Sequence, residues 1–127
     1  MAELTSVSQR PGSPRRVTSF TARCCWFVDG ITLAFSDGTC ITYGAETGGT
    51  CGPWQLGGNE FLVAVEQLNH AAGYLGSCII FKTSQDRWIS VKKRPNKRRQ
   101  SEYFEATAGH HIVGLTLVGS HLVQSSP

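Results

Sequence analysis

The chain has 127 residues and a formal net charge of +3, from 12 Lys and Arg against 9 Asp and Glu. This length fits one domain with its own hydrophobic core, and no apolar run approaches the ~18 residues of a membrane-spanning helix. Glycine is abundant at 14 residues, methionine occurs once, and no window has the long helical periodicity of a bundle. The composition therefore favours an all-β fold of short strands.

Residues 1–16 (MAELTSVSQRPGSPRR) are rich in Ser, Pro, Gly and Arg and contain few apolar side chains. This composition predicts a flexible arm, followed by one folded domain over residues 17–127. The segment also lacks the apolar stretch of a secretory signal. We therefore expect a cytoplasmic protein, with the nucleus or unconventional secretion as alternatives.

Apolar and polar residues begin to alternate at Val17, which predicts a first strand over residues 17–22. A second strand over residues 31–35 leads into Ser36-Asp37-Gly38, which is a strong hairpin signal. The return strand contains Thr42 and Tyr43. Residues 44–54 include four glycines and are expected to form a loop.

Residues 59–83 carry the clearest strand pattern, because Phe61, Val63 and Val65 recur at every second position. A loop at residues 69–73 separates this strand from a second one at residues 75–81. Eight or nine strands of ordinary length are expected in the chain. The later ones fall at residues 88–91, 101–106 and 111–118, with a remnant at 122–123. The expected core consists of Phe20, Ile31, Leu33, Phe35, Phe61, Val63, Val65, Ile79, Phe81, Ile89, Phe104, Ile112, Val113 and Leu115.

The five cysteines, at positions 24, 25, 40, 51 and 78, are an odd number without C-x-x-C spacing. They predict reduced, mostly structural thiols, with a Cys40–Cys51 disulfide as the alternative. His110 and His111 are adjacent on an expected strand, so they face opposite ways and do not chelate one metal together. No nucleophile with a base and an acid is visible. We expect no metal, no cofactor and no enzymatic activity.

Three segments share one plan of strand, loop, strand, turn and strand: residues 17–44, 59–91 and 102–123. Three similar four-stranded units are the organisation of a β-prism. DGITLAFSDGTCITYG, NEFLVAVEQ followed by GYLGSCIIFKTSQDRWISV, and FEATAGHHIVGLTL together resemble the jacalin-related lectin family. That family includes the animal zymogen-granule lectins and the lectin module of aerolysin-like fish proteins. The resemblance covers residues 17–117.

The resemblance implies an all-β, β-prism I-like fold of three Greek-key units with four strands each. The usual first strand has no clear counterpart before Val17, and the chain ends before a full closing strand. The implied prism therefore lacks its first and last strands. Such a prism has an open sheet edge, which a second copy of the chain or a protein partner would cover.

The resemblance also implies binding of mannose-type or galactose-type sugars through a Gly-x-x-x-Asp loop between two strands of a unit. The carboxylate there accepts hydrogen bonds from adjacent sugar hydroxyls, and an aromatic ring covers the apolar sugar face. Only the first unit keeps an acid; in the second unit, Gly76 stands where the carboxylate would be, and residues 119–123 offer no acid. The candidate sugar-binding residues are Asp29, Trp26, Phe27, Gly30, Gly73 and Tyr74. The alternative is that Asp29-Gly30 is a turn and that the aromatic residues pack.

Half of the basic residues fall within residues 92–99. These candidate anion-binding residues are Lys92, Lys93, Arg94, Lys97, Arg98 and Arg99. The cluster could hold sulfated glycans, a nucleic acid or an acidic membrane, act as a nuclear-import signal, or be a solvated turn. Nearby aromatic residues are too few for a base-stacking platform, so nucleic acid is not the expected partner.

The function expected from these features is a carbohydrate-binding, lectin-like module. It favours anionic or sulfated glycans through residues 92–99, the basic loop. The first alternative is a β-prism without sugar binding that acts in protein interaction or homo-oligomeric assembly. The second is polyanion binding through residues 92–99.

Overall fold

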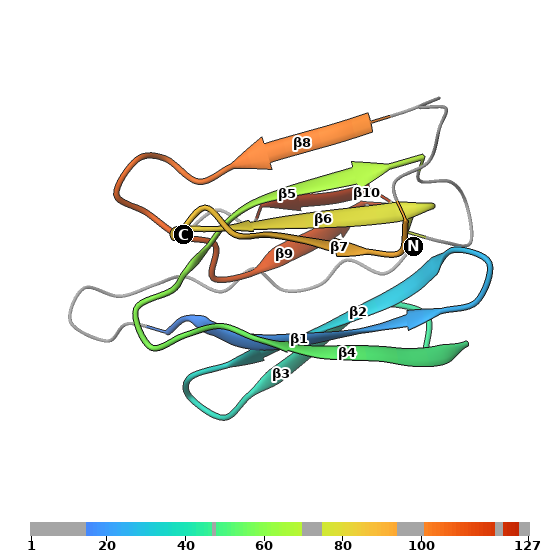
Figure 1. Ribbon diagram of the computed structural model, residues 1–127, viewed down its shortest axis with the longest axis horizontal. Helices are drawn as coiled ribbons and strands as arrows, with labels where there is room; N and C mark the ends of the chain where they lie inside the picture. The colour runs from blue at the N-terminus through green and yellow to red at the C-terminus, as the bar shows by residue number, and fades with distance from the viewer. Residues whose placement is uncertain (1–14, 47, 70–74, 94–100, 119–120, 125–127) are drawn as a thin grey trace.

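Ten β-strands make up the regular structure of the described part of the chain in the computed structural model (Figure 1). The structure describes residues 15–46, 48–69, 75–93, 101–118 and 121–124. The strands are β1 (Val17–Cys24), β2 (Val28–Phe35), β3 (Cys40–Gly44), β4 (Gly49–Gln55), β5 (Leu62–Leu68), β6 (Cys78–Thr83), β7 (Trp88–Val91), β8 (Ser101–Glu105), β9 (Leu115–Val118) and β10 (His121–Gln124). The described residues contain no helix long and apolar enough to cross a membrane.

The strands form two antiparallel sheets of four strands and a two-stranded hairpin. The strand orders are β3-β2-β1-β4 and β7-β6-β5-β8, and β9 pairs with β10. Both orders place the fourth strand beside the first, which is the Greek-key arrangement. The two larger sheets therefore repeat one topology, and they lie as facing layers in Figure 1. The prediction of an all-β, β-prism-like fold built from Greek-key units is confirmed, with two strands instead of four in the described part of the third unit.

Two expected boundaries between units were wrong. Residues 44–54 were expected to form a loop, but β4 pairs with β1 at the edge of the first sheet. Glycine and proline lower the intrinsic strand preference of this segment, yet an edge strand tolerates Pro53 because one side needs no N–H donor. The other error concerns β8, which was expected to open the third unit. It pairs with β5 and completes the second sheet.

The last expected strand is shorter than the pattern suggested. Residues 111–114 are not in a strand, and β9 begins at Leu115. Ile112 and Val113 are nevertheless buried, and the Ile112 N–H donates to the Leu62 carbonyl at 2.8 Å. The apolar pattern of this segment is that of a buried strand, because alternation alone does not distinguish such a strand from a loop whose apolar residues pack in the core. The remnant expected at residues 122–123 is part of β10.

The core lies between the two larger sheets. The ring of Phe20 on β1 contacts that of Phe81 on β6, with 4.3 Å between the ring centroids, and stacks on that of Trp54 at 5.4 Å. Tyr43 is fully buried, and its hydroxyl accepts a hydrogen bond from the Leu115 N–H at 2.8 Å. This bond joins the first sheet to the start of β9. Most of the expected core residues are buried.

A β-bulge explains where the expected core was wrong on β5. Phe61 and Val63 are only half-buried, whereas Leu62 and Ala64 are buried. The pairing of β5 with β6 shifts register between Leu62 and Ala64. A bulge inserts one extra residue and so reverses which side chains face the core on one side of it.

The chain is already attached to the domain at Arg15 and Arg16, within the segment expected to be an arm. The Arg15 guanidinium lies 3.7 Å from the centroid of the Phe35 ring. The Arg16 Nη1 donates to the carbonyls of Gly57 at 3.1 Å and Glu60 at 3.0 Å. Residues 1–14 lie outside the described residues.

All five cysteines are free thiols, so the alternative Cys40–Cys51 disulfide is not formed. Cys24 and Cys78 are buried, whereas Cys25 and Cys40 are exposed. Burial raises the pKa of the Cys24 thiol to about 12, and the neighbouring Cys51 thiol acts in the same direction. Cys24 therefore stays protonated at neutral pH.

This difference predicts how the native protein reacts with thiol reagents. Because the reagent needs access to the sulfur, iodoacetamide at pH 8 should modify the exposed Cys25 and Cys40 first. Cys24 and Cys78 should react only after unfolding. Peptide mass mapping of native and urea-unfolded samples measures the order, and rapid native labelling of Cys24 would contradict the burial of this residue.

Candidate functional site

Asp29 is the extra residue of a β-bulge in β2. Arg23 pairs with Gly30 and Cys24 pairs with Val28, which leaves Asp29 without a partner on β1. Bulges re-aim the side chain that they carry and are common beside binding sites. The expected alternative, a turn at Asp29-Gly30, is wrong, because both residues lie within β2 and the turn lies at residues 25–27.

The backbone of the β3–β4 connection lies directly against the bulge. The Ala45 N–H donates to the Asp29 carbonyl at 2.9 Å, and a Cβ on Gly30 would collide with the Ala45 carbonyl. A Cβ on Gly48, which has a φ of +87°, would lie 2.6 Å from the Cys24 carbonyl oxygen and 3.1 Å from Asp29 Oδ2. Gly30 and Gly48 therefore permit a close approach of three backbone segments around Asp29.

The carboxylate of Asp29 makes no hydrogen bond or ion pair with any residue that the structure describes. The side chain is only half-buried, so it stays in contact with solvent. An ionised carboxylate can accept up to about four hydrogen bonds. All of these acceptor positions of the Asp29 carboxylate are therefore available to a ligand.

The β1–β2 turn places two aromatic side chains next to this acid. The Cys25 N–H donates to the Phe27 carbonyl at 3.0 Å, which closes a tight turn. The Trp26 side chain at its tip is 84% exposed and that of Phe27 is 39% exposed. Both were predicted as site residues, and the structure brings them to the hairpin that carries Asp29.

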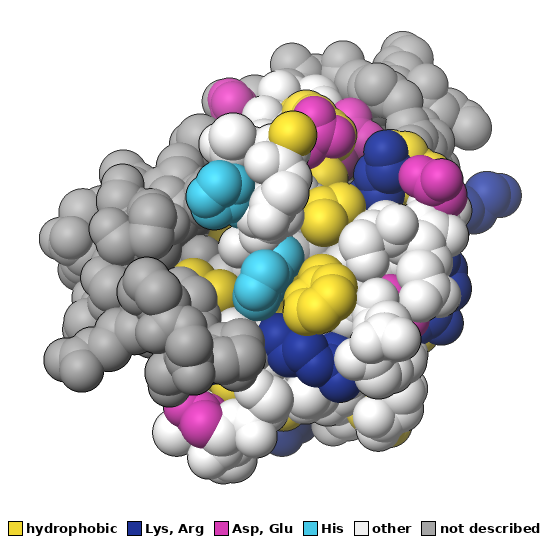
Figure 2. Space-filling model, turned by 90° about the vertical axis from the view of Figure 1, so that its left-hand side faces the viewer, with side chains coloured by type: hydrophobic (Ala, Val, Ile, Leu, Met, Phe, Trp, Pro, Cys, Tyr) yellow, Lys and Arg dark blue, Asp and Glu magenta, His cyan; other side chains and the backbone are white. Residues whose placement is uncertain are grey.

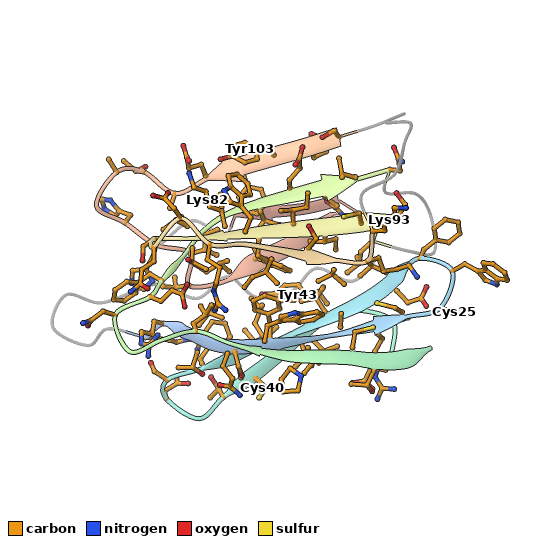
Figure 3. All side chains as sticks on the ribbon, viewed as in Figure 1. Cys25, Cys40, Tyr43, Lys82, Lys93 and Tyr103 are labelled. Atoms are coloured by element: carbon orange, nitrogen blue, oxygen red, sulfur yellow. The ribbon has the colours of Figure 1, made fainter. Side chains whose placement is uncertain are left out.

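Part of the basic loop reaches the same hairpin. The Lys92 Nζ, from just after β7, donates to the Cys25 carbonyl at 3.0 Å. Lys93 is exposed, and Figure 3 shows Lys93 and Cys25 at one end of the molecule. The structure therefore joins residues of the predicted sugar site and of the predicted anion site. The other candidates at the two sites lie outside the described residues: Gly73, Tyr74, Arg94, Lys97, Arg98 and Arg99.

The β5–β6 connection is hydrogen-bonded to β2 at the base of the aromatic turn. The Val28 N–H donates to the Gly76 carbonyl and the Leu75 N–H to the Val28 carbonyl, both at 2.8 Å. Gly76, which stands at the position of the implied site carboxylate in the second unit, therefore links the two Greek keys. A Cβ at this position would lie 2.6 Å from the Leu68 carbonyl.

A hollow of about 440 Å³ lies at the opposite end of the molecule (Figure 2). It is lined by Phe61, Val63, Ser84, Gly109, His110 and His111. The His111 ring packs on Phe61, with 4.9 Å between centroids, and burial lowers the pKa of this histidine. Within the described ranges, no three His, Cys, Asp or Glu side chains are close enough to hold a metal ion. The lining of the hollow contains one serine and two histidines but no carboxylate.

No protein-family model matches the chain, and no curated protein sequence matches it. Its structure is similar to that described as "Crystal structure of Lamprey immune protein", with a TM-score of 0.59 and 18% sequence identity. The match covers 87% of this chain and 35% of the lamprey chain. The chain thus spans about a third of that protein, and at this identity the similarity shows a shared fold alone.

Proposed function

We propose that the chain is a carbohydrate-binding module of the jacalin-like β-prism type, with its site at the Asp29 bulge. The unpaired, half-buried carboxylate of Asp29 beside the Gly48 backbone carries this proposal. An ionised carboxylate can accept from two neighbouring sugar hydroxyls, and the exposed Trp26 ring can cover the apolar face of a pyranose. The absence of a side chain at position 48 lets the β3–β4 backbone lie close to Cys24 and to the Asp29 carboxylate.

Lys93 extends the proposal to anionic glycans. This side chain is exposed at the same end and has no partner in the part of the chain that the structure describes. Lys92 instead bonds to the Cys25 carbonyl and so positions the aromatic turn. A sulfate or carboxylate on the glycan would pair with the free ammonium group of Lys93.

Assembly through an open sheet edge is less well supported. The edge strand β4 contains Pro53, and the edge strand β8 carries Glu102 and Glu105. Proline and charged side chains on edge strands are devices that prevent pairing with other chains. Two of the four edge strands of the larger sheets, β4 and β8, therefore carry residues that oppose pairing with another chain.

The Asp29→Asn variant tests the sugar site. It keeps the shape of the side chain and removes the charge, so we expect affinity for neutral glycans to fall roughly tenfold or more. Binding is measured on an array of neutral and sulfated glycans at low and near-physiological salt. Asp37→Asn, at the exposed β2–β3 turn, is the matched control and should bind like wild type.

The same array separates the two parts of the proposal. Lys93→Gln should weaken only binding to sulfated glycans and reduce its dependence on salt. Equal binding by wild type and Asp29→Asn would show that Asp29 is not the sugar acceptor. Failure of wild type to bind any glycan would overturn the proposed function itself.

A further inference from the structure

Trp26 is the most exposed large apolar side chain that the structure describes. The other two strongly exposed aromatic residues have polar partners. Trp88 lies 5.2 Å from the Lys82 ammonium, and the Tyr103 hydroxyl donates to Glu105 at 3.1 Å. Trp26 has no such partner among the described residues. Phe27 follows it directly, so two aromatic side chains share one protruding turn.

The turn is held in place by bonds from three directions. A backbone hydrogen bond from the Cys25 N–H to the Phe27 carbonyl closes the turn, and the Lys92 ammonium donates to the Cys25 carbonyl. At the base of the turn, Val28 pairs with Gly76. A braced tip loses little conformational entropy when it binds. The exposure of Trp26 is therefore a fixed feature of the fold.

Basic residues accompany the aromatic tip. Those in the described part are Arg23, Lys92 and Lys93, against the acids Asp29 and Glu46. Each basic residue near an anionic membrane contributes about 1 kcal/mol of attraction.

We propose that this end docks on anionic phospholipid membranes, with Trp26 and Phe27 entering the headgroup boundary and Lys93 pairing with lipid phosphates or carboxylates. Tryptophan prefers this boundary because its ring is apolar and its indole N–H is polar. Combined apolar insertion and basic attraction is how peripheral proteins hold to membranes. The inference goes beyond the proposed function, because it needs the tip and the lysine but not the Asp29 carboxylate.

The test is sedimentation with vesicles of phosphatidylcholine alone or mixed with phosphatidylserine, using the whole chain. Wild type should bind the mixed vesicles and not the neutral ones, with binding that weakens as salt rises. Trp26→Ser should lower the affinity at least about tenfold, and Lys93→Gln about fivefold. Trp88→Ser, an exposed tryptophan 53% accessible on β7, is the control and should bind like wild type.

Fluorescence provides a second readout that loss of fold cannot imitate. The chain has three tryptophans, so a Trp54→Phe, Trp88→Phe variant reports on Trp26 alone. Its emission should shift to shorter wavelength on mixed vesicles. An absent shift, or binding unchanged by Trp26→Ser, would overturn the proposal. Binding of glycans without binding of vesicles would also overturn the membrane proposal, and it would leave the proposed function in place. Vesicle binding that Asp29→Asn does not weaken would support the membrane proposal.

Discussion

Replacement of Phe20 by alanine is expected to lower the free energy of unfolding by about 3–5 kcal/mol, because it leaves a cavity between the two larger sheets. Phe20 is 1% exposed and contacts Phe81 of the facing sheet and Trp54 of its own. Its ring thus supplies apolar contacts that hold the layers together. Urea unfolding followed by circular dichroism measures the change, which should appear as a lower midpoint with little change in slope.

Two further variants define this effect. Phe20→Leu keeps most of the volume and should cost less than about 1.5 kcal/mol. Trp26→Ala removes an even larger aromatic side chain from an exposed position, and it should change stability by no more than about 0.5 kcal/mol. A loss below about 1 kcal/mol for Phe20→Ala would contradict the packing of the sheets through this ring.

Glu60→Ala is expected to have the second large effect. The buried Glu60 carboxylate accepts hydrogen bonds from the Gly57 N–H at 2.9 Å, the Thr83 hydroxyl at 2.6 Å and Arg87 at 3.0 Å. Alanine leaves these donors without their acceptor. Since Arg87 is partly exposed and can turn to water, we expect a loss of about 2–4 kcal/mol in the same urea experiment.

The same hydrogen bonds make the contribution of Glu60 to the free energy of unfolding depend on pH. Hydrogen bonds from Thr83 and Gly57, with the Arg87 charge, lower the pKa of Glu60 below 4.5. The stabilisation is therefore complete above this value and is lost as the pH falls through the lower pKa of the folded state. The stability difference between wild type and Glu60→Gln should be constant near neutral pH and shrink in acid.

Asp86→Asn is the matched control for this titration. Asp86 is 89% exposed and pairs with Lys82 across 3.9 Å. An exposed pair of this kind contributes little, so the variant should stay within about 0.5 kcal/mol of wild type. A Glu60→Gln difference that stayed undiminished below the lowered pKa of the folded state would show that the ionised carboxylate does not stabilise the fold.

Local sequence patterns gave most of the strands because alternation records which side chains face a core. Ile31, Leu33 and Phe35 were expected on one face and are all buried. The hairpin expected at residues 36–38 is present, with the Gly38 N–H bonded to the Phe35 carbonyl at 3.0 Å. These features depend on neighbours within a few residues. The repeated Greek keys were expected from the family resemblance, not from these local patterns.

The alternation of apolar and polar residues did not predict the structure where pairing with another strand determines it. β4 carries glycine and proline and gains its strand geometry from hydrogen bonds to β1. The bulges at Asp29 and between Leu62 and Ala64 arise from register shifts against neighbouring strands. A sequence reading assumes an unbroken alternation, so a single inserted residue reverses its assignment of core side chains.

For the candidate site, the sequence by itself determined the residue types: an acid, two aromatic residues and a basic cluster. Only the tertiary structure placed Lys92 against the Cys25 carbonyl, across 67 residues of chain. It also laid the backbone of Gly48 beside the Asp29 carboxylate and left that carboxylate unpaired. Contacts of this range depend on how the two Greek keys pack together, and the alternation within single strands carries no information about them.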